Sequence, residues 1–247
     1  MLKGPTSILY GENVPGGIVN LVSKRPTYEH QGEVNLSYGT HDRRQFSVDV
    51  SGALNKEGSV RGRMVSLIRE ADTQIDSMED DRIYFAPSLA IDLSDSDTLT
   101  LLGQYQKDST EIQLGLPASG TLLDNPGGKL GTDTNLGHPD WDGFDREFWT
   151  LGYEYEHRFD DDWTFRQNGR YTRSLVDRQE TWLQFVDAGY GSNIGAYNLD
   201  RANESRIYSI DNQVVGNVTT GALENTMLFG ASFDKTSFLQ SQYASDI

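Results

Sequence analysis

Apolar and polar side chains alternate in a series of segments from about residue 31 to the end of the chain. Alternation with a period of two is typical of β-strands that present one face to an apolar environment. We count about nine such segments of roughly 9–13 residues, whereas the usual strand has about 5–6 residues and a tilted strand crosses a bilayer in roughly 9–11. The apolar stripes include Val34, Leu36 and Tyr38; Phe46, Val48 and Val50; Ile83, Phe85, Leu89 and Ile91; Leu99, Leu101 and Tyr105; Trp149, Leu151, Tyr153 and Tyr155; Trp163, Phe165 and Tyr171; and Met227, Phe229, Ala231 and Phe233.

The first 26 residues follow a different pattern, punctuated by glycine and proline. Gly4-Pro5 can open a short helical turn that stops at Gly11, and Pro15-Gly16-Gly17 is a turn signal. Residues 17–23 are nearly continuously apolar, which predicts a strand buried on both faces. The chain therefore divides into a short N-terminal region and a long region of amphipathic strands.

The predicted joints between strands differ in length from one side to the other. Every second joint is short, at 55–58, 94–96, 160–162 and 219–221. Three of the intervening joints are longer, at about 73–81, 109–145 and 177–205, whereas the first, at 39–42, is short and breaks the rule. Since up-and-down topology puts alternate joints on the same side of a sheet, this asymmetry is typical of outer-membrane barrels. It predicts an all-β fold, a partial transmembrane antiparallel up-and-down β-barrel.

The polar stripes carry charge, including Asp49, Glu154, Glu156, Arg166 and Arg170. In a large barrel these side chains face a wet or plugged lumen, while the apolar stripe faces lipid. The alternative is a water-soluble β-sandwich or solenoid, in which the apolar stripe is an ordinary core. Alternation alone does not separate the two, but the strand lengths and the unequal joints favour the barrel.

Composition removes several classes of function. The chain has 247 residues and a formal charge of −16, so it has no excess of cations to neutralise nucleic-acid phosphates. With 36% hydrophobic and 11% aromatic residues, it is too apolar for a disordered chain. It contains no cysteine, which excludes disulfides, thiolate metal sites and a cysteine nucleophile. No run of about 18 apolar residues could form a transmembrane helix, and no apolar signal segment follows Lys3.

The N-terminal region resembles the end of the plug domain in TonB-dependent receptors. The similarity rests on three stretches, Leu2–Gly11, Pro15–Asn20 and Ser23–Pro26. The first has a basic residue before Gly-Pro and ends in Leu-Tyr-Gly, the second has Pro-Gly-Gly and an asparagine in an apolar strand, and the third is Ser-Lys-Arg-Pro. The variant is most similar to ferrichrome-type siderophore receptors. Residues 115–117, 159–169 and 228–230 also resemble that group.

The resemblance implies a bacterial outer-membrane receptor that binds a ferric siderophore, lies in outer-membrane lipid and is powered by the TonB–ExbB–ExbD complex. Residues 1–28 would be the C-terminal end of the plug domain, and residues 29–247 the N-terminal part of a barrel of about 22 strands. The signal peptide, the TonB-contacting segment and most of the plug would then precede Met1. More than half of the barrel would follow Ile247.

Five residues of the N-terminal region are expected to join plug and barrel. The resemblance places Lys3 where the family usually has an arginine that pairs with glutamates of the barrel wall. Gly16 and Gly17 would let the backbone turn and pack closely against the wall. Lys24 and Arg25 would help to connect the two domains. A structural role for these residues is favoured over direct contact with the ligand.

The long predicted joints hold the candidate ligand-binding residues. In siderophore receptors, aromatic side chains at the outer mouth pack against the chelate, and Trp and Tyr add a polar group to a large rigid surface. Trp141, Trp182, Phe185 and Tyr190 are the candidates, and Phe144 lies beside the first of them. The alternative is that they pack the loops or belong to the interfacial aromatic belt.

Nothing in the sequence suggests catalysis or a resident cofactor. The acidic runs Asp95-Ser96-Asp97 and Asp160-Asp161-Asp162 lie in short turns and lack the spacing of a calcium loop. The four histidines are scattered, and no nucleophile elbow, phosphate loop or dinucleotide fingerprint is present. Two further functions stay open: a TonB-dependent receptor for another nutrient such as cobalamin or a glycan, and a secreted soluble β-protein that binds surfaces or carbohydrates.

Overall fold

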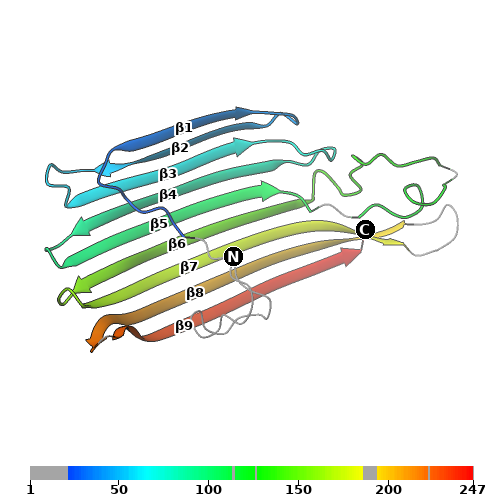
Figure 1. The fold of residues 1–247 in the computed structure, drawn as a ribbon. Helices are drawn as coiled ribbons and strands as arrows, with labels where there is room; N and C mark the ends of the chain where they lie inside the picture. The colour runs from blue at the N-terminus through cyan, green and yellow to red at the C-terminus, as the bar shows by residue number, and fades with distance from the viewer. Residues whose placement is uncertain (1–21, 113–114, 126, 186–193, 222, 247) are drawn as a thin grey trace.

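The computed structural model describes residues 22–112, 115–125, 127–185, 194–221 and 223–246, with the backbone alone for 183–185, 194–196 and 246. They form one sheet of nine antiparallel strands, each paired with the next along the chain (Figure 1). The strands are β1 (Gln31–Tyr38), β2 (Arg44–Ala53), β3 (Val60–Glu70), β4 (Asp80–Asp92), β5 (Asp97–Thr110), β6 (Gly143–Arg158), β7 (Trp163–Phe185), β8 (Ile194–Thr220) and β9 (Leu223–Asp246). No helix in the described part of the chain is long and apolar enough to cross a membrane.

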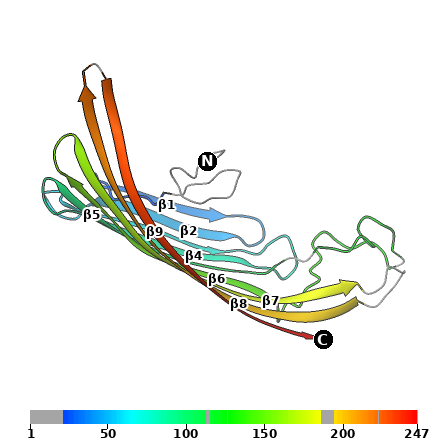
Figure 2. The same cartoon turned by 90° about the horizontal axis from the view of Figure 1, so that it is seen from below.

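The predicted all-β class, strand number and up-and-down order are confirmed. The predicted strand lengths hold only for the first half of the chain, because β7, β8 and β9 have 23, 27 and 24 residues. Figure 2 shows these long strands running the length of a curved and twisted sheet. The predicted strand over residues 17–23 lies almost wholly outside the described residues.

The joints at one end of the sheet are short, as predicted, with residues 54–59, 93–96 and 159–162 between strands. At the other end, residues 71–79 and 111–142 form two long loops. The predicted long joint at 177–205 is wrong, since residues 177–185 pair with residues 194–202 as a continuation of β7 and β8. The polar sequence there suggested a loop, but backbone pairing needs no apolar stripe once strands extend beyond an apolar band.

The register of the ladder sorts the side chains onto two faces. Residues directly opposite each other share a face, and the chain of partners Ser51–Arg63–Ser88–Leu102–Gly152 follows one face across the sheet. We call this the inner face, because residues 22–30 cross it (Figure 1). It holds all the charged residues predicted to face a lumen: Asp49, Glu154, Glu156, Arg166 and Arg170.

The opposite, outer face carries the predicted apolar stripes, and they are exposed. Leu36, Leu151 and Phe233 are 81%, 62% and 62% exposed. The few buried apolar residues of the described chain, such as Ile75 and Met78, lie mainly near the loop end. A sandwich would bury these stripes against a second sheet, so that alternative is wrong for the described residues.

One glycine shows how the outer face is packed. On β7, Gly169 lies under the aromatic ring of Tyr153, and a Cβ added there would come within 2.3 Å of that ring. The Tyr153 hydroxyl reaches past it to donate a hydrogen bond of 2.8 Å to the Gln167 side chain. Any larger residue at position 169 would lift the ring off the sheet.

Candidate functional site

Residues 22–30, which we call the strap, contain no strand or helix and lie across the inner face (Figure 1). The Lys24 ammonium contacts Asp49 of β2 at 2.5 Å. Arg63 of β3 holds the same carboxylate with two hydrogen bonds, of 2.8 and 2.7 Å, and donates a third of 3.1 Å to the Arg25 carbonyl. The strap is thus joined to β2 and β3 through one shared carboxylate.

The strap also reaches two other parts of the wall. Arg25 forms a two-pronged ion pair with Glu154 of β6, with Nε 2.8 Å from Oε2. The backbone N–H and the hydroxyl of Thr27 both lie 2.8 Å from the Ser51 hydroxyl. Of the five predicted plug–barrel residues, Lys24 and Arg25 therefore contact the wall, whereas Lys3, Gly16 and Gly17 lie outside the described residues.

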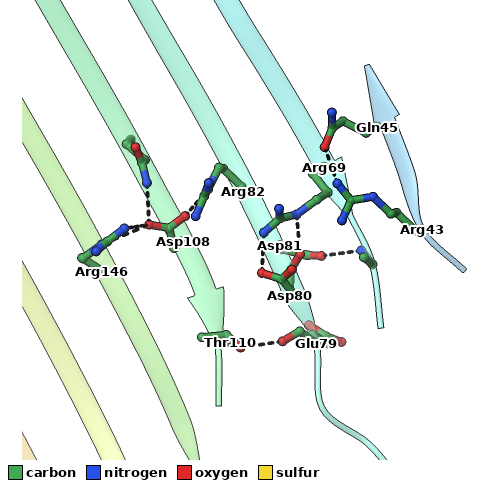
Figure 3. Close-up of polar contacts among 12 residues, drawn as sticks. Arg43, Gln45, Arg69, Glu79, Asp80, Asp81, Arg82, Asp108, Thr110 and Arg146 are labelled. Carbon is green, nitrogen blue, oxygen red and sulfur yellow. Dashed lines mark hydrogen bonds and ion pairs between the residues drawn. The ribbon is translucent and has the colours of Figure 1, made fainter. Parts of the chain in front are cut away.

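A cluster of arginines and carboxylates occupies the inner face near its loop end (Figure 3). Its centre is Asp108 of β5, only 7% exposed, which accepts hydrogen bonds from Arg82 of β4 at 2.5 Å and Arg146 of β6 at 2.5 and 3.0 Å. Gln106 donates a further bond of 2.7 Å. Next to it, Arg69 donates to the Asp80 carbonyl at 2.9 Å and pairs with its carboxylate. We call these residues the rim cluster.

The two long loops contact each other just outside the rim cluster. The Asp76 N–H donates to the Asp133 carbonyl at 2.9 Å, and the Asn135 amide donates to the Asp76 carbonyl at 3.1 Å and to the Glu111 carboxylate at 3.3 Å. Burial raises the pKa of the Glu111 carboxyl, as do the carboxylates of Asp142 and Glu79, while the bond from Asn135 acts in the opposite direction.

An aromatic pair lies on the inner face of the long β7–β8 hairpin. The rings of Trp182 and Tyr197 are directly opposite in the ladder and stack with centroids 6.4 Å apart. The Trp182 indole N–H donates to Glu180 at 2.8 Å, and Arg178 holds the other oxygen of that carboxylate. Glu180 is only 3% exposed, whereas Trp182 is 40% exposed. The pair therefore presents an aromatic surface whose orientation is fixed by a buried carboxylate.

The other predicted ligand-binding aromatics are distributed between loop and strand. Trp141 lies in the 111–142 loop, as predicted, and its buried indole nitrogen has no hydrogen-bond partner among the described residues. Its neighbour Asp142 accepts a bond of 2.6 Å from the Thr181 N–H, which ties this end of the loop to β7. Trp182 and Phe185 belong to β7 rather than to a loop, and Tyr190 lies outside the described residues.

Sequence reasoning missed Asp108, Glu180 and Tyr197. Each is an alternating residue of a strand whose neighbours on the next strand are known only from the register. The one available signal was the repeated charge at the loop ends of adjacent strands, as in Arg82, Asp108 and Arg146.

The inner face near the loop end offers side chains that can bind a ligand. In the described part of the chain, no group of three or more histidines, aspartates and glutamates could hold a metal ion. The side chains of Arg82 and Arg146 are 36% and 43% exposed, so their free edges can donate hydrogen bonds to an oxygen-rich ligand. Together with the Trp182–Tyr197 surface, they offer donors and aromatic area on the same inner face.

Comparison with known proteins identifies the architecture. The family described as TonB dependent receptor-like, beta-barrel, matches residues 84–246. The chain is 32% identical over 244 residues to the ferrioxamine B receptor of Salmonella typhimurium, covering 96% of this chain and 34% of that protein. It is 30% identical over 251 residues to the ferrichrome outer membrane transporter/phage receptor of Escherichia coli, covering 94% and 34%. The chain thus spans about a third of the length of the curated relatives it matches.

Solved structures agree with the fold. The ferripyoverdine receptor of the outer membrane of Pseudomonas aeruginosa superposes with a TM-score of 0.87 at 23% sequence identity, covering 98% of this chain and 32% of that one. The matched family and the similar fold account for the single curved sheet, its unequal joints and its two distinct faces. The chain belongs to the TonB-dependent receptor β-barrel family.

Proposed function

We propose that this chain is part of an outer-membrane receptor for TonB-dependent uptake of ferric siderophores. Residues 1–28 would be the C-terminal end of its plug domain and residues 29–247 the first nine strands of its barrel. The outer face would contact lipid, and the inner face would surround the plug and the ligand's route. The ligand is a ferric siderophore, transported rather than retained as a cofactor.

One observation favours this function over the alternative functions. The sheet exposes an apolar outer face while a strap of basic residues is bound to its charged inner face by Lys24 and Arg25. A water-soluble sheet would bury its apolar face, and the inner face of an empty pore would have no segment lying across it. The relatives named for ferrioxamine B and ferrichrome support a ferric chelate over cobalamin or a glycan.

The ligand would meet the loop end of the inner face. The candidates are Trp141, Trp182, Phe185 and Tyr190, with Tyr197 added because it stacks on Trp182. Aromatic rings cover the apolar surface of a chelate, and the free edges of Arg82 and Arg146 donate to its oxygens. Transport would then depend on the TonB–ExbB–ExbD complex acting on a plug segment upstream of this chain.

The test is uptake by the receptor that contains this chain, expressed in a bacterium lacking its own siderophore receptors. Radioactive iron supplied as ferrioxamine B, ferrichrome or pyoverdine should enter cells that have an active TonB complex and not cells that lack it. Labelled cobalamin serves as the competing ligand. Uptake of cobalamin without uptake of any ferric chelate would contradict the iron assignment but leave the barrel architecture intact.

A further inference from the structure

Two of the barrel side chains that bind the strap are also held in place by other residues of the barrel strands. Asp49, which receives Lys24, is held by two hydrogen bonds from Arg63. Ser51, which receives Thr27, donates to the Gly62 carbonyl at 3.2 Å. The wall therefore keeps these acceptors in position whether or not the strap is bound.

A third wall site repeats this arrangement. The Arg61 guanidinium lies 4.0 Å from the centre of the Tyr28 ring, a cation–π contact. The same guanidinium is held by Asp92, with Nη2 2.8 Å from Oδ1, and by the Gly58 carbonyl at 2.9 Å. A preorganised partner binds more tightly, since no side chain has to be ordered when contact forms.

Arg25 is bound by two different strands of the sheet. Its carbonyl accepts from Arg63 of β3, while its side chain pairs with Glu154 of β6. These two anchors belong to strands that are not neighbours in the sheet. A displacement of Arg25 from its place on the wall would therefore break at least one of these two contacts. Both are charge-assisted hydrogen bonds, which are stronger than hydrogen bonds between neutral groups.

We infer that the strap is a fixed anchor, which stays on the barrel wall throughout transport and marks the end of the part of the plug that moves. This inference rests on the proposed function. Force transmitted along the chain from upstream would arrive at Ser23, directly before the first two wall contacts. Rearrangement of the plug would stop there, and residues 24–28 would keep their places on β2, β3 and β6.

A reversible cross-link tests this directly in the full-length receptor. Thr27 and Ser51 have side-chain oxygens 2.8 Å apart, and the 247 residues contain no cysteine that could compete. In the double variant Thr27→Cys with Ser51→Cys, oxidation should lock the strap to β2. A fixed anchor predicts that iron uptake differs by less than about twofold between oxidised and reduced cells. Loss of uptake by about tenfold on oxidation, restored by a reducing agent, would overturn the inference.

A second measurement examines the Arg25–Glu154 contact and needs no transport. In the single variant Thr27→Cys, the rate of alkylation by a thiol reagent reports how often the strap leaves the wall. Adding Glu154→Gln should raise that rate about tenfold, because the amide cannot form the ion pair. The matched control is Glu156→Gln, on the same strand and face but paired with Arg166 of the barrel. Equal rates in the two variants would contradict the anchor.

The two measurements separate this inference from the proposed function. A receptor that takes up no ferric chelate in either redox state contradicts the function, and the alkylation rates then decide the anchor alone. A receptor that takes up iron when reduced but not when oxidised contradicts the anchor alone.

Discussion

The two ends of the inner face use the same chemistry for different purposes. At the loop end, the rim cluster joins neighbouring strands, as when Asp108 of β5 binds Arg82 of β4 and Arg146 of β6. Towards the short-joint end, Asp49 and Glu154 bind a segment that belongs to no strand and lie on β2 and β6, far apart in the sheet. An arginine–carboxylate pair therefore stabilises the sheet in one place and attaches a separate segment in the other.

This difference predicts that the same kind of substitution gives different results at the two ends. A change at the rim removes a contact between strands and should appear as lower stability of the sheet. A change at a carboxylate that binds the strap should appear as greater accessibility of the strap, in addition to any loss of a contact between strands.

The largest effect is expected for Asp108→Ala. The substitution removes a carboxylate that is 7% exposed and leaves Arg82, Arg146 and Gln106 without their shared acceptor. We expect a loss of about 2–4 kcal/mol in the free energy of unfolding, measured by urea unfolding of the receptor in detergent.

The control for this change is Glu156→Ala, in which an exposed carboxylate loses its partner Arg166. Both side chains of that pair are more than 40% exposed, at 43% and 50%. The expected loss is below about 1 kcal/mol because water screens such a pair. Equal losses in the two variants would show that the rim cluster does not stabilise the sheet more than a surface pair.

A smaller loss of stability is expected for Asp49→Asn at the strap end. The amide oxygen still accepts from Arg63, so the barrel contact weakens by about 1–2 kcal/mol, but the ion pair with Lys24 is lost. Alkylation of Thr27→Cys should at the same time become faster. The control is Asp145→Asn, whose carboxylate is 54% exposed and 3.9 Å from Lys107. A stability loss without faster alkylation would mean that Lys24 does not hold the strap.

Much of the fold followed from the alternation of side chains, for a physical reason. Where a strand crosses an apolar medium, one stripe must be apolar, so stripes such as Val34, Leu36 and Tyr38 mark the strand. The β7–β8 extension carries polar residues on both faces, for example Arg178 opposite Arg201 on the inner face and Gln179 opposite Asp200 on the outer face. Outside an apolar medium the backbone ladder alone forms the strand, and no stripe records it.

The candidate site was predictable only in part. Lys24 and Arg25 were found because they continue a motif in the chain, and both contact the wall. Their partners Asp49 and Glu154 were expected to face the lumen, but nothing in the sequence pairs residue 25 with residue 154. Contacts of that range depend on the register of every intervening hairpin, which a one-residue slip in any strand would change.

The next prediction concerns the aromatic surface at the far end of the inner face. Trp182→Ala removes a ring that is 40% exposed and stacked on Tyr197. We expect the affinity for a ferric siderophore to fall about three- to tenfold, measured by fluorescence quenching or equilibrium dialysis, with little change in stability. Trp149→Ala is the matched control, because Trp149 lies on the outer face and is 43% exposed. Equal affinities in the two variants would exclude Trp182 from the binding surface.

The smallest effect is expected at Glu111, where the two long loops meet. Because burial raises the pKa of this carboxyl above its ordinary value of 4.5, the folded loops hold the proton at pH values where the unfolded chain has lost it. The contribution of this group to stability is therefore greatest at low pH and decreases as the pH rises from 4.5 through the raised pKa. Glu111→Gln keeps an oxygen for the hydrogen bond from Asn135 and removes the titration. The measurement is the rate of amide hydrogen exchange in residues 71–79 and 131–136, taken as the ratio of the wild-type rate to the Glu111→Gln rate at each pH. This ratio should be close to one under acidic conditions and rise towards neutral pH. A ratio that stays constant across that range would mean that the charge of Glu111 does not weaken the contact between the loops.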